Sequence, residues 1–203
     1  MNFAIIFSII ALAILFVINL AEYDVSYVKS HFDGRIHLVR NLPDRKKAAN
    51  VIAELKKKFR ILIDSVSIKY KNDPIHRKGV WRLKNKFKSD NIQESAPHSK
   101  YTSFSVNKGE ELHLCIRPKD PKVAEKHTFH KINTLMFVGI HELAHIMSLT
   151  YGHNREFHRN FVFLLKNAVE IGVYKKTNYR HYKEKFCGIE INNTPLSDKY
   201  LAK

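Results

Sequence analysis

The sequence predicts an α+β domain that follows a single apolar N-terminal helix. Apolar and polar residues alternate, as in half-buried strands, in three short runs at 35–42, 101–106 and 111–116. Apolar residues recur at helical spacing in two longer runs at 44–68 and 128–150. The residues before position 22 carry no ionisable side chain. A chain of 203 residues is long enough for one such domain with an appendage.

Composition excludes several other classes of protein. A hydrophobic content of 44%, with 13 Phe and 9 Tyr, excludes a wholly disordered chain. Two Cys are too few for a dense disulfide framework or for a four-cysteine zinc site. With 35 Lys and Arg against 19 Asp and Glu, the net charge is +16, and it lies entirely after the apolar run. Such a domain attracts anionic partners, which include nucleic acid, acidic lipid head groups and acidic proteins.

The N-terminal run at residues 3–20 is predicted to be a transmembrane helix. Its roughly 18 mostly apolar residues, at ~1.5 Å each, nearly span a hydrocarbon core of ~30 Å. The alternative is a cleaved signal peptide, which has a basic start and a small-x-small cleavage site. No Lys or Arg precedes the run, and the Asn-Leu-Ala that ends it is a poor cleavage site. We therefore predict a single-pass anchor at 1–21 and a stem at 22–34.

The charges that follow the anchor predict its orientation. Lys29, Arg35 and Arg40 lie on its C-terminal side, whereas the N-terminal side has only the amino group. Because basic residues favour the cytoplasmic side of a membrane, we expect the domain to be cytoplasmic. In that compartment Cys115 and Cys187 would stay reduced, and we expect them to pack rather than to react.

Turn and cap residues predict the other boundaries within the domain, which we place at 35–203. Asp44 is a suitable N-cap for the first long helix. The sequence Asn-Lys-Gly at 107–109 predicts a hairpin between the second and third strands, since Asn and Gly tolerate positive φ. Gly152 is expected to break the second long helix, and Asn154 to cap another helix after it.

Residues 71–100 are polar and are predicted to be irregular. Within them, Arg77–Lys88 carries six basic residues and no acidic one, with Trp81 and Phe87 in between. Basic residues interleaved with aromatic ones can clamp phosphates and stack bases, so this surface would suit nucleic acid, or acidic lipid. The alternative, which we favour, is a solvated segment whose two aromatic rings fill the core.

The most informative stretch is an HExxH motif that begins at His141 and ends at His145. Residues four apart lie one helical turn apart on the same face of a helix, so both imidazoles can reach one ion. Glu142 follows the first of them and can reach a water on the metal rather than the metal itself. Zinc lowers the pKa of such a water, and Glu142 would take its proton as general base while the water attacks a carbonyl.

A catalytic zinc usually has three protein ligands and one open position. We expect His153 to be the third ligand, because a break at Gly152 lets the chain fold back toward the metal. His158 is the competitor, but it follows Phe157 inside the next helix, where a packing or surface role is expected. The motif also arises by chance in a chain with 12 His, so the alternative is two surface histidines beside a solvated Glu142. The amphipathic helix and the turn after it favour the metal site.

The second half of the chain resembles the WLM family of zincin metallopeptidases, relatives of the SprT-like and Spartan proteases. The pattern of that family is a strand, HELxH on a helix, and then a His followed four residues later by a Phe. Here these features fall at Leu112–Arg117, His141–His145, His153 and Phe157. The similar region, which contains the core of the metal site, covers about 101–174.

More narrowly, the chain is similar to a membrane-anchored branch of this family that large DNA viruses of eukaryotes encode. This similarity rests on phrases such as NTLMFVGIHELAHIMS at 133–148 and FCGIEINNTPL at 186–196. The resemblance implies a zincin-like domain with a small antiparallel or mixed sheet, an HExxH helix and bound Zn²⁺. It also implies hydrolysis of a protein or peptide substrate, and it adds the virion interior as a location for the domain.

Together these observations predict a membrane-anchored zinc metallopeptidase. His141, His145 and His153 bind the zinc, and Glu142 is the general base. The substrate backbone is expected to add alongside an edge strand at 112–116. Two alternatives remain, a catalytically idle scaffold with this fold and a basic nucleic-acid-binding protein of a viral membrane. The intact general base argues against the scaffold, and a steep salt dependence of binding would indicate nucleic acid.

Overall fold

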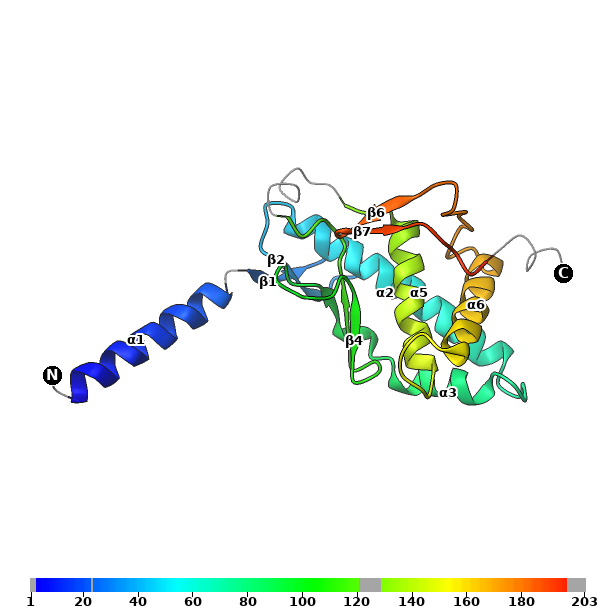
Figure 1. Cartoon of the computed structure of the whole chain (residues 1–203), viewed down its shortest axis with the longest axis horizontal. Coiled ribbons are helices and arrows are strands. Elements are labelled where there is room, and N and C mark those ends of the chain that lie inside the picture. Colours follow the sequence, from blue (N-terminus) through cyan, green and yellow to red (C-terminus); the bar gives the residue numbers. More distant parts are fainter. Residues whose placement is uncertain (1–2, 23, 121–128, 197–203) are drawn as a thin grey trace.

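Two helices, α2 and α5, pack against one face of a small mixed sheet (Figure 1). The computed structural model describes residues 3–22, 24–120 and 129–196. The sheet has the order β3–β5–β4, in which β5 runs parallel to β3 and antiparallel to β4. Its strands are β3 (Ile92–Glu94), β4 (Phe104–Val106) and β5 (Glu111–Leu114). The predicted α+β class with a small mixed sheet is therefore confirmed.

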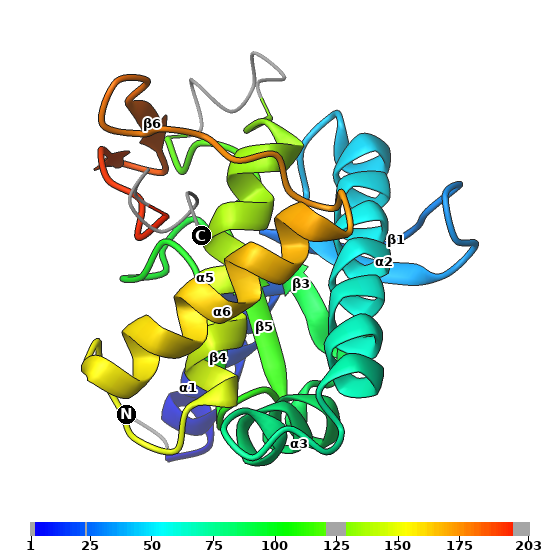
Figure 2. The ribbon, with the colours of Figure 1, turned by 90° about the vertical axis from the view of Figure 1, so that its right-hand side faces the viewer.

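The helices of the domain follow the predicted amphipathic patterns, with one addition, α3. Helix α6 lies on the side of α5 that faces away from the sheet (Figure 2). The helix predicted over 128–150 is α5, and its expected start at residue 128 lies outside the described residues. The bounds are Arg45–Lys69 for α2, Arg77–Lys86 for α3, Ser89–Asn91 for the short 3-10 helix η1, Ile132–Met147 for α5 and Arg155–Glu170 for α6.

Helix α3 lies in the segment 71–100, which was expected to be irregular. Its buried residues Gly79, Val80 and Leu83 form a short apolar face that packs on α2 and α5. The Asp73 carboxylate accepts backbone N–H groups just before the helix and so supports its first turn. The prediction was wrong because the apolar face is only one turn long, and the basic residues outside it dominate the local pattern.

The two aromatic residues of this basic segment have different environments. Phe87 is half-buried and packs edge-on against Phe59 of α2, with ring centroids 6.4 Å apart. Trp81 is 65% exposed, because it lies outside the buried face of α3. The expectation that both rings fill the core is therefore correct for Phe87 and wrong for Trp81.

A two-stranded ribbon precedes α2 and packs against it. Its strands are β1 (Val25–Lys29) and β2 (Ile36–Arg40), paired antiparallel. β2 lies within the strand predicted at 35–42, whereas β1 lies within the predicted stem at 22–34. The sequence of β1 shows little alternation, and pairing with β2 is what makes it a strand. Val28 of β1 joins the core, so part of the stem packs with the domain.

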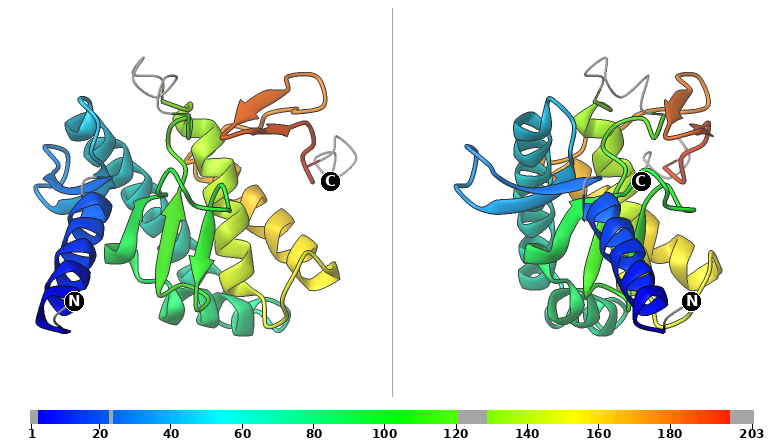
Figure 3. Two further views of the ribbon diagram at one scale, coloured as in Figure 1. Left: turned by 60° about the vertical axis from the view of Figure 1, so that its left-hand side comes forward. Right: turned by 90° about the vertical axis from the view of Figure 1, so that its left-hand side faces the viewer.

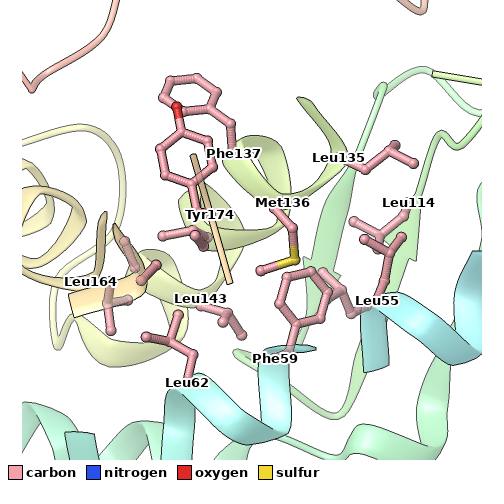
Figure 4. Packing of buried hydrophobic residues seen from close by; sticks show 14 of the residues in the cluster. Leu55, Phe59, Leu62, Leu114, Leu135, Met136, Phe137, Leu143, Leu164 and Tyr174 are labelled. Atoms are coloured by element: carbon pink, nitrogen blue, oxygen red, sulfur yellow. The ribbon is translucent and has the colours of Figure 1, made fainter. Parts of the chain in front are cut away.

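The core lies between α2, α5, α6 and the sheet (Figure 4). Phe59 of α2 faces Gly139 of α5, where an added Cβ would come within 2.1 Å of the ring. α5 therefore approaches α2 more closely than a larger residue would permit. Leu55, Met136 and Leu143 are fully buried around this contact, at a gain of ~1.5–3 kcal/mol for each side chain. This packing sets the position of α5, which carries the HExxH motif.

A disulfide joins a C-terminal hairpin to the sheet. The hairpin consists of β6 (Glu184–Phe186) and β7 (Ile189–Ile191), and Cys187 lies in its turn. Cys187 is bonded to Cys115, which directly follows β5. The expectation of two reduced thiols is therefore wrong. The hairpin folds back over the end of β5 and brings the two Cα atoms to 6.4 Å, within the range that a disulfide spans.

A helix forms in the apolar N-terminal run. α1 (Phe3–Glu22) projects from the rest of the chain (Figure 3). Apolar side chains such as Phe3 and Phe7 are exposed along it. Within the residues that the structure describes, no helix combines the length and the apolar character needed to cross a membrane. The transmembrane part of the prediction at 1–21 is therefore unsupported.

Candidate metal centre

Three histidine side chains converge where the end of α5 meets the loop that precedes α6. His141 and His145 lie one turn apart on α5, and their Nε2 atoms are 3.2 Å apart. The Nε2 atom of His153 lies 3.0 Å from that of His141 and 3.2 Å from that of His145. Ligand nitrogens at ~2.0–2.1 Å from a tetrahedral zinc lie about 3.3–3.4 Å from one another. The near-equilateral arrangement of the three nitrogens therefore fits one zinc ion.

The loop that carries His153 begins earlier than the sequence indicates. α5 ends at Met147, and Ser148 already has extended backbone angles, so Gly152 does not terminate the helix. Gly152 instead has a φ of 77°, which only a glycine adopts without strain, and it turns the chain just before His153. Asn154 then caps α6 as predicted, and its Oδ1 atom accepts the backbone N–H of Phe157 at 3.1 Å.

Burial keeps two histidines of this cluster, His141 and His145, neutral. It lowers the pKa of His141 to about 3, and the charges that His145, His153 and His158 would carry act in the same direction. It also lowers the pKa of His145 to about 4, with His153 and Lys108 acting in the same direction. At neutral pH these two imidazoles are uncharged, so each can present a lone pair to a cation. Such a set of donors suits a metal cation.

Glu142 is buried beside this cluster and points into the same cleft. Burial raises the pKa of its carboxyl to about 8, while a hydrogen bond from the backbone N–H of Ser105 acts in the opposite direction. Ser105 lies in β4, so the sheet and α5 together hold this carboxyl in place. Among the described residues, the group whose ligand atoms converge contains the three histidines and not Glu142. Its placement suits proton transfer rather than metal ligation.

Phe157 forms the floor of the histidine cluster. Its ring stacks on that of His145 with a centroid distance of 4.2 Å, and it lies 4.8 Å from the ring centroids of both His141 and His153. Phe157 is fully buried, so it fixes the three imidazoles without competing for their nitrogens. His158, the competing third ligand, is exposed on α6 and lies outside the converging group.

Comparisons with known proteins identify related sequences. Residues 81–199 match the WLM domain. Uncharacterized protein R325 of Acanthamoeba polyphaga mimivirus is 33% identical over 195 residues, which cover 96% of each chain. The chain belongs to the WLM family. The viral proteins similar to this WLM chain also include uncharacterized protein 136R of Invertebrate iridescent virus 6, which is 34% identical over 85 residues, or 42% of this chain and 44% of that protein.

A solved structure also resembles this WLM chain. The crystal structure of Wss1 from Saccharomyces cerevisiae is 23% identical and has a TM-score of 0.46, covering 66% of this chain and 88% of that one. The resemblance to the WLM family that the motifs predicted is confirmed, and the family is one of zincin-like metallopeptidases. A zinc ion is the metal that this family implies, and the three imidazoles fit it.

The edge strand beside the WLM metal centre is not the one predicted. β5 (Glu111–Leu114), which covers most of the run expected at 112–116, lies between β3 and β4 and has both of its sides paired. β4 is the edge strand instead, because the hairpin places it outside β5, next to α5. Ser103, Phe104 and Ser105 line one wall of a cleft of about 420 Å³, and the three histidines and Glu142 line another part of it.

Lys108 is a residue of this cleft that sequence reasoning did not assign. It lies in the β4–β5 turn, and its ammonium group reaches the loop between α5 and α6. Its partners are backbone carbonyls about 40 positions away in the chain, and a backbone partner leaves no signal in a single sequence. Tyr151 also lines the cleft, and its exposed ring lies 4.2 Å from the Lys108 ammonium.

Proposed function

We propose that this WLM chain is a zinc-dependent metallopeptidase that hydrolyses peptide bonds in a protein or peptide substrate. The observation that carries the proposal is the meeting of three imidazoles, from His141, His145 and His153, beside the buried carboxyl of Glu142 in an open cleft. Zinc held by the three imidazoles would acidify a water and polarise the scissile carbonyl. That donor set leaves one tetrahedral position open, which a hydrolytic site requires.

Glu142 would carry the proton in this reaction. Its carboxylate lies next to the first ligand, from where it takes a proton from the attacking water and passes it to the leaving amine. The backbone N–H of Ser105 orients the carboxylate, and burial of the Glu142 side chain limits its contact with bulk water. An extended substrate would pair with the outer edge of β4, whose residues Phe104 and Ser105 line the cleft.

Zinc content and peptide cleavage, measured together on the full chain and on Glu142→Gln, test this proposal. We expect the wild type to bind one zinc per chain and to cleave an unfolded protein substrate. Glu142→Gln should keep the zinc and lose cleavage, because the amide cannot accept the proton. Cleavage that survives in Glu142→Gln, or a purified wild type that neither contains nor takes up zinc, would contradict the proposal.

A second candidate function is binding of single-stranded nucleic acid by α3. The exposed Trp81 lies in a shallow hollow of about 510 Å³ whose other lining residues are Lys71, Arg77, Lys78 and Arg82. Stacking of a base on the indole with phosphates on the cations is how such surfaces bind single strands. Trp81 is the one Trp of the chain, so quenching of its fluorescence by an oligonucleotide measures binding at this surface directly. The binding should weaken steeply as the salt concentration rises. Unchanged fluorescence at low salt would contradict it, and quenching by anionic vesicles alone would assign the surface to lipid.

We also propose that α1 attaches the chain to a membrane. Its exposed apolar side chains, such as Phe3, Phe7 and Leu12, would be costly to leave in water. The sequence placed the domain in the cytoplasm or the virion interior, whereas a disulfide such as Cys115–Cys187 favours an oxidising compartment. Carbonate extraction of membranes compares attachment of the full chain with that of residues 22–203. Protease added from each side of intact membranes then determines the location of the domain.

A further inference from the structure

We propose that Lys108 is the positioning residue for the third histidine. Its ammonium group gathers the backbone carbonyls of the loop between α5 and α6, and this loop presents His153 to the metal. The inference rests on the proposed function, because the position of His153 matters only if the site holds a metal. Lys108 itself is directed at the loop rather than at the histidine nitrogens.

The ammonium of Lys108 has its full complement of partners in this loop. Its Nζ atom donates to the carbonyls of Ser148 at 2.8 Å, Leu149 at 2.6 Å and Thr150 at 3.0 Å. An ammonium has three N–H groups, so three consecutive carbonyls use all of them. Carbonyls of successive residues point to one cation only when the chain curls around it. Lys108 therefore lies at the centre of this curl and holds its three carbonyls together.

An anion holds the same loop from the other side. The Glu156 carboxylate accepts the backbone N–H groups of Leu149 at 2.9 Å and Thr150 at 3.0 Å, and the Thr150 hydroxyl at 2.7 Å. Arg82 of α3 donates to Glu156 at 3.2 Å and to the carbonyl of Met147 at 3.0 Å. The loop thus has its carbonyls turned to a cation and its amides turned to an anion. This arrangement defines the path of the chain three residues before His153.

The backbone of Lys108 lies in the turn that ends β4, the strand along which a substrate is proposed to pair. The residue lies in the tight β4–β5 turn with a φ of 53°, in the left-handed region, and the next carbonyl, that of Gly109, accepts the N–H of Lys88 at 2.9 Å. β4 is the free edge along which a substrate would pair. One side chain therefore ties the end of that edge to the loop of the third ligand, and it sets the distance between the substrate strand and the metal.

The test compares zinc affinity in three variants of the full chain, measured by competition with a chelator. Lys108→Met should weaken zinc binding by ~10–100-fold, the loss typical when support for a ligand is removed. Lys108→Arg should restore most of it, because a guanidinium also donates to several carbonyls. Lys86→Met is the matched control, since it removes a nearby exposed charge that makes no bond to the loop, and it should bind zinc as the wild type does.

Two further measurements separate positioning from a general structural role. The d–d absorption of the Co²⁺-substituted protein should change in Lys108→Met and return in Lys108→Arg, because it reports the ligands around the ion. Equal zinc affinity in Lys108→Met and wild type, or an equal loss in Lys86→Met, overturns the proposal. If Lys108→Met does not fold, Glu156→Gln loosens the loop from the other side, and unchanged zinc affinity there overturns it as well. A wild type that binds zinc tightly but cleaves nothing would contradict the peptidase proposal alone.

Discussion

Two polar clusters of this protein, one buried around Arg117 and one in the cleft around His145, differ in how their polar groups are paired. Arg117, with no exposed surface, forms two hydrogen bonds to the Glu94 carboxylate at 2.7 and 2.8 Å, and it also pairs with Asp44. The backbone N–H of Arg40 donates to the same Glu94 carboxylate at 2.8 Å. In the histidine cluster, by contrast, three bases face one another, and no acidic side chain of the described chain converges with them.

The difference separates a structural cluster from a functional one. In the Arg117 cluster each charge meets an opposite charge, and the bonds join β2, β3, the start of α2 and the end of β5 into one unit. Three imidazole Nε2 atoms lie within 3.2 Å of one another, and no acidic side chain of the described residues converges with them. A cation that takes a lone pair from each ring would stabilise this arrangement. Polar groups that converge without an opposite charge therefore identify the candidate metal site more clearly than burial does.

The largest effect is expected from substitutions at the histidine cluster and at Glu142 beside it. Glu142→Gln should lower kcat/KM for peptide cleavage by ~10²–10⁴-fold, the usual contribution of a general base. His145→Ala should abolish zinc binding and cleavage together, because it removes one of three ligands. Zinc content and initial rates of cleavage measure both. Equal zinc loss in the two variants would mean that Glu142 is itself a ligand.

Breaking the Arg117 cluster should reduce stability rather than zinc binding. Glu94→Gln leaves a buried guanidinium without its main partner, so the free energy of unfolding should fall by ~3–5 kcal/mol. Replacing both partners, with Arg117→Met and Glu94→Leu, should cost less than Glu94→Gln, because the buried guanidinium is removed together with its main carboxylate. Urea unfolding of the three proteins measures this. If the double variant is less stable than Glu94→Gln, the attraction between Arg117 and Glu94 stabilises the fold by more than the burial of their charges costs.

Removing the disulfide should have an intermediate effect. Cys115→Ser with Cys187→Ser opens a link across 72 residues and should lower the free energy of unfolding by ~2–4 kcal/mol. A reducing agent should lower the stability of the wild type and leave the double variant unchanged. Alkylation followed by mass spectrometry provides the control, since it counts the free thiols before reduction. Two free thiols in the purified wild type would restore the expectation made from the sequence.

The two candidate third ligands should differ sharply from each other. His153→Ala should lose zinc and cleavage, because its Nε2 atom completes the triangle of nitrogens. His158→Ala should keep its zinc and change activity by ~10-fold or less, since this exposed ring lies behind Phe157. Zinc analysis of the two purified variants decides between them, and an empty site in His158→Ala with a filled one in His153→Ala would reverse the assignment.

The smallest expected effect is a pH dependence of stability from Glu156. Partial burial raises the pKa of this carboxyl, but the N–H groups of Leu149 and Thr150, the Thr150 hydroxyl and Arg82 outweigh it and lower the pKa to about 2. A lowered pKa stabilises the fold above the unfolded value of ~4.3, and this stability is lost as the pH falls toward 2. Urea midpoints should therefore fall less steeply between pH 5 and pH 2 in Glu156→Gln than in the wild type. Parallel profiles would show that the carboxylate contributes nothing to the loop.

Features that depend on neighbours in the chain were determined by the sequence alone. The spacing of His141 and His145 follows from the helical repeat, and the residues of the β4–β5 turn and the cap Asn154 act within four positions of themselves. The same local signals predicted α2, α5 and the hairpin. The WLM motifs also predicted His153, because the pattern of the family includes the turn that separates this residue from the HExxH helix.

Only the tertiary structure decided the features that depend on distant pairs. Whether β4 or β5 is the edge strand depends on where β3 pairs, and the disulfide forms because a hairpin 72 residues away folds back over β5. Lys108 bonds to backbone carbonyls, which every residue has, so no pattern of side chains reveals its partners. A single sequence encodes local preferences in its spacing, whereas contacts between distant segments follow from how the whole core packs.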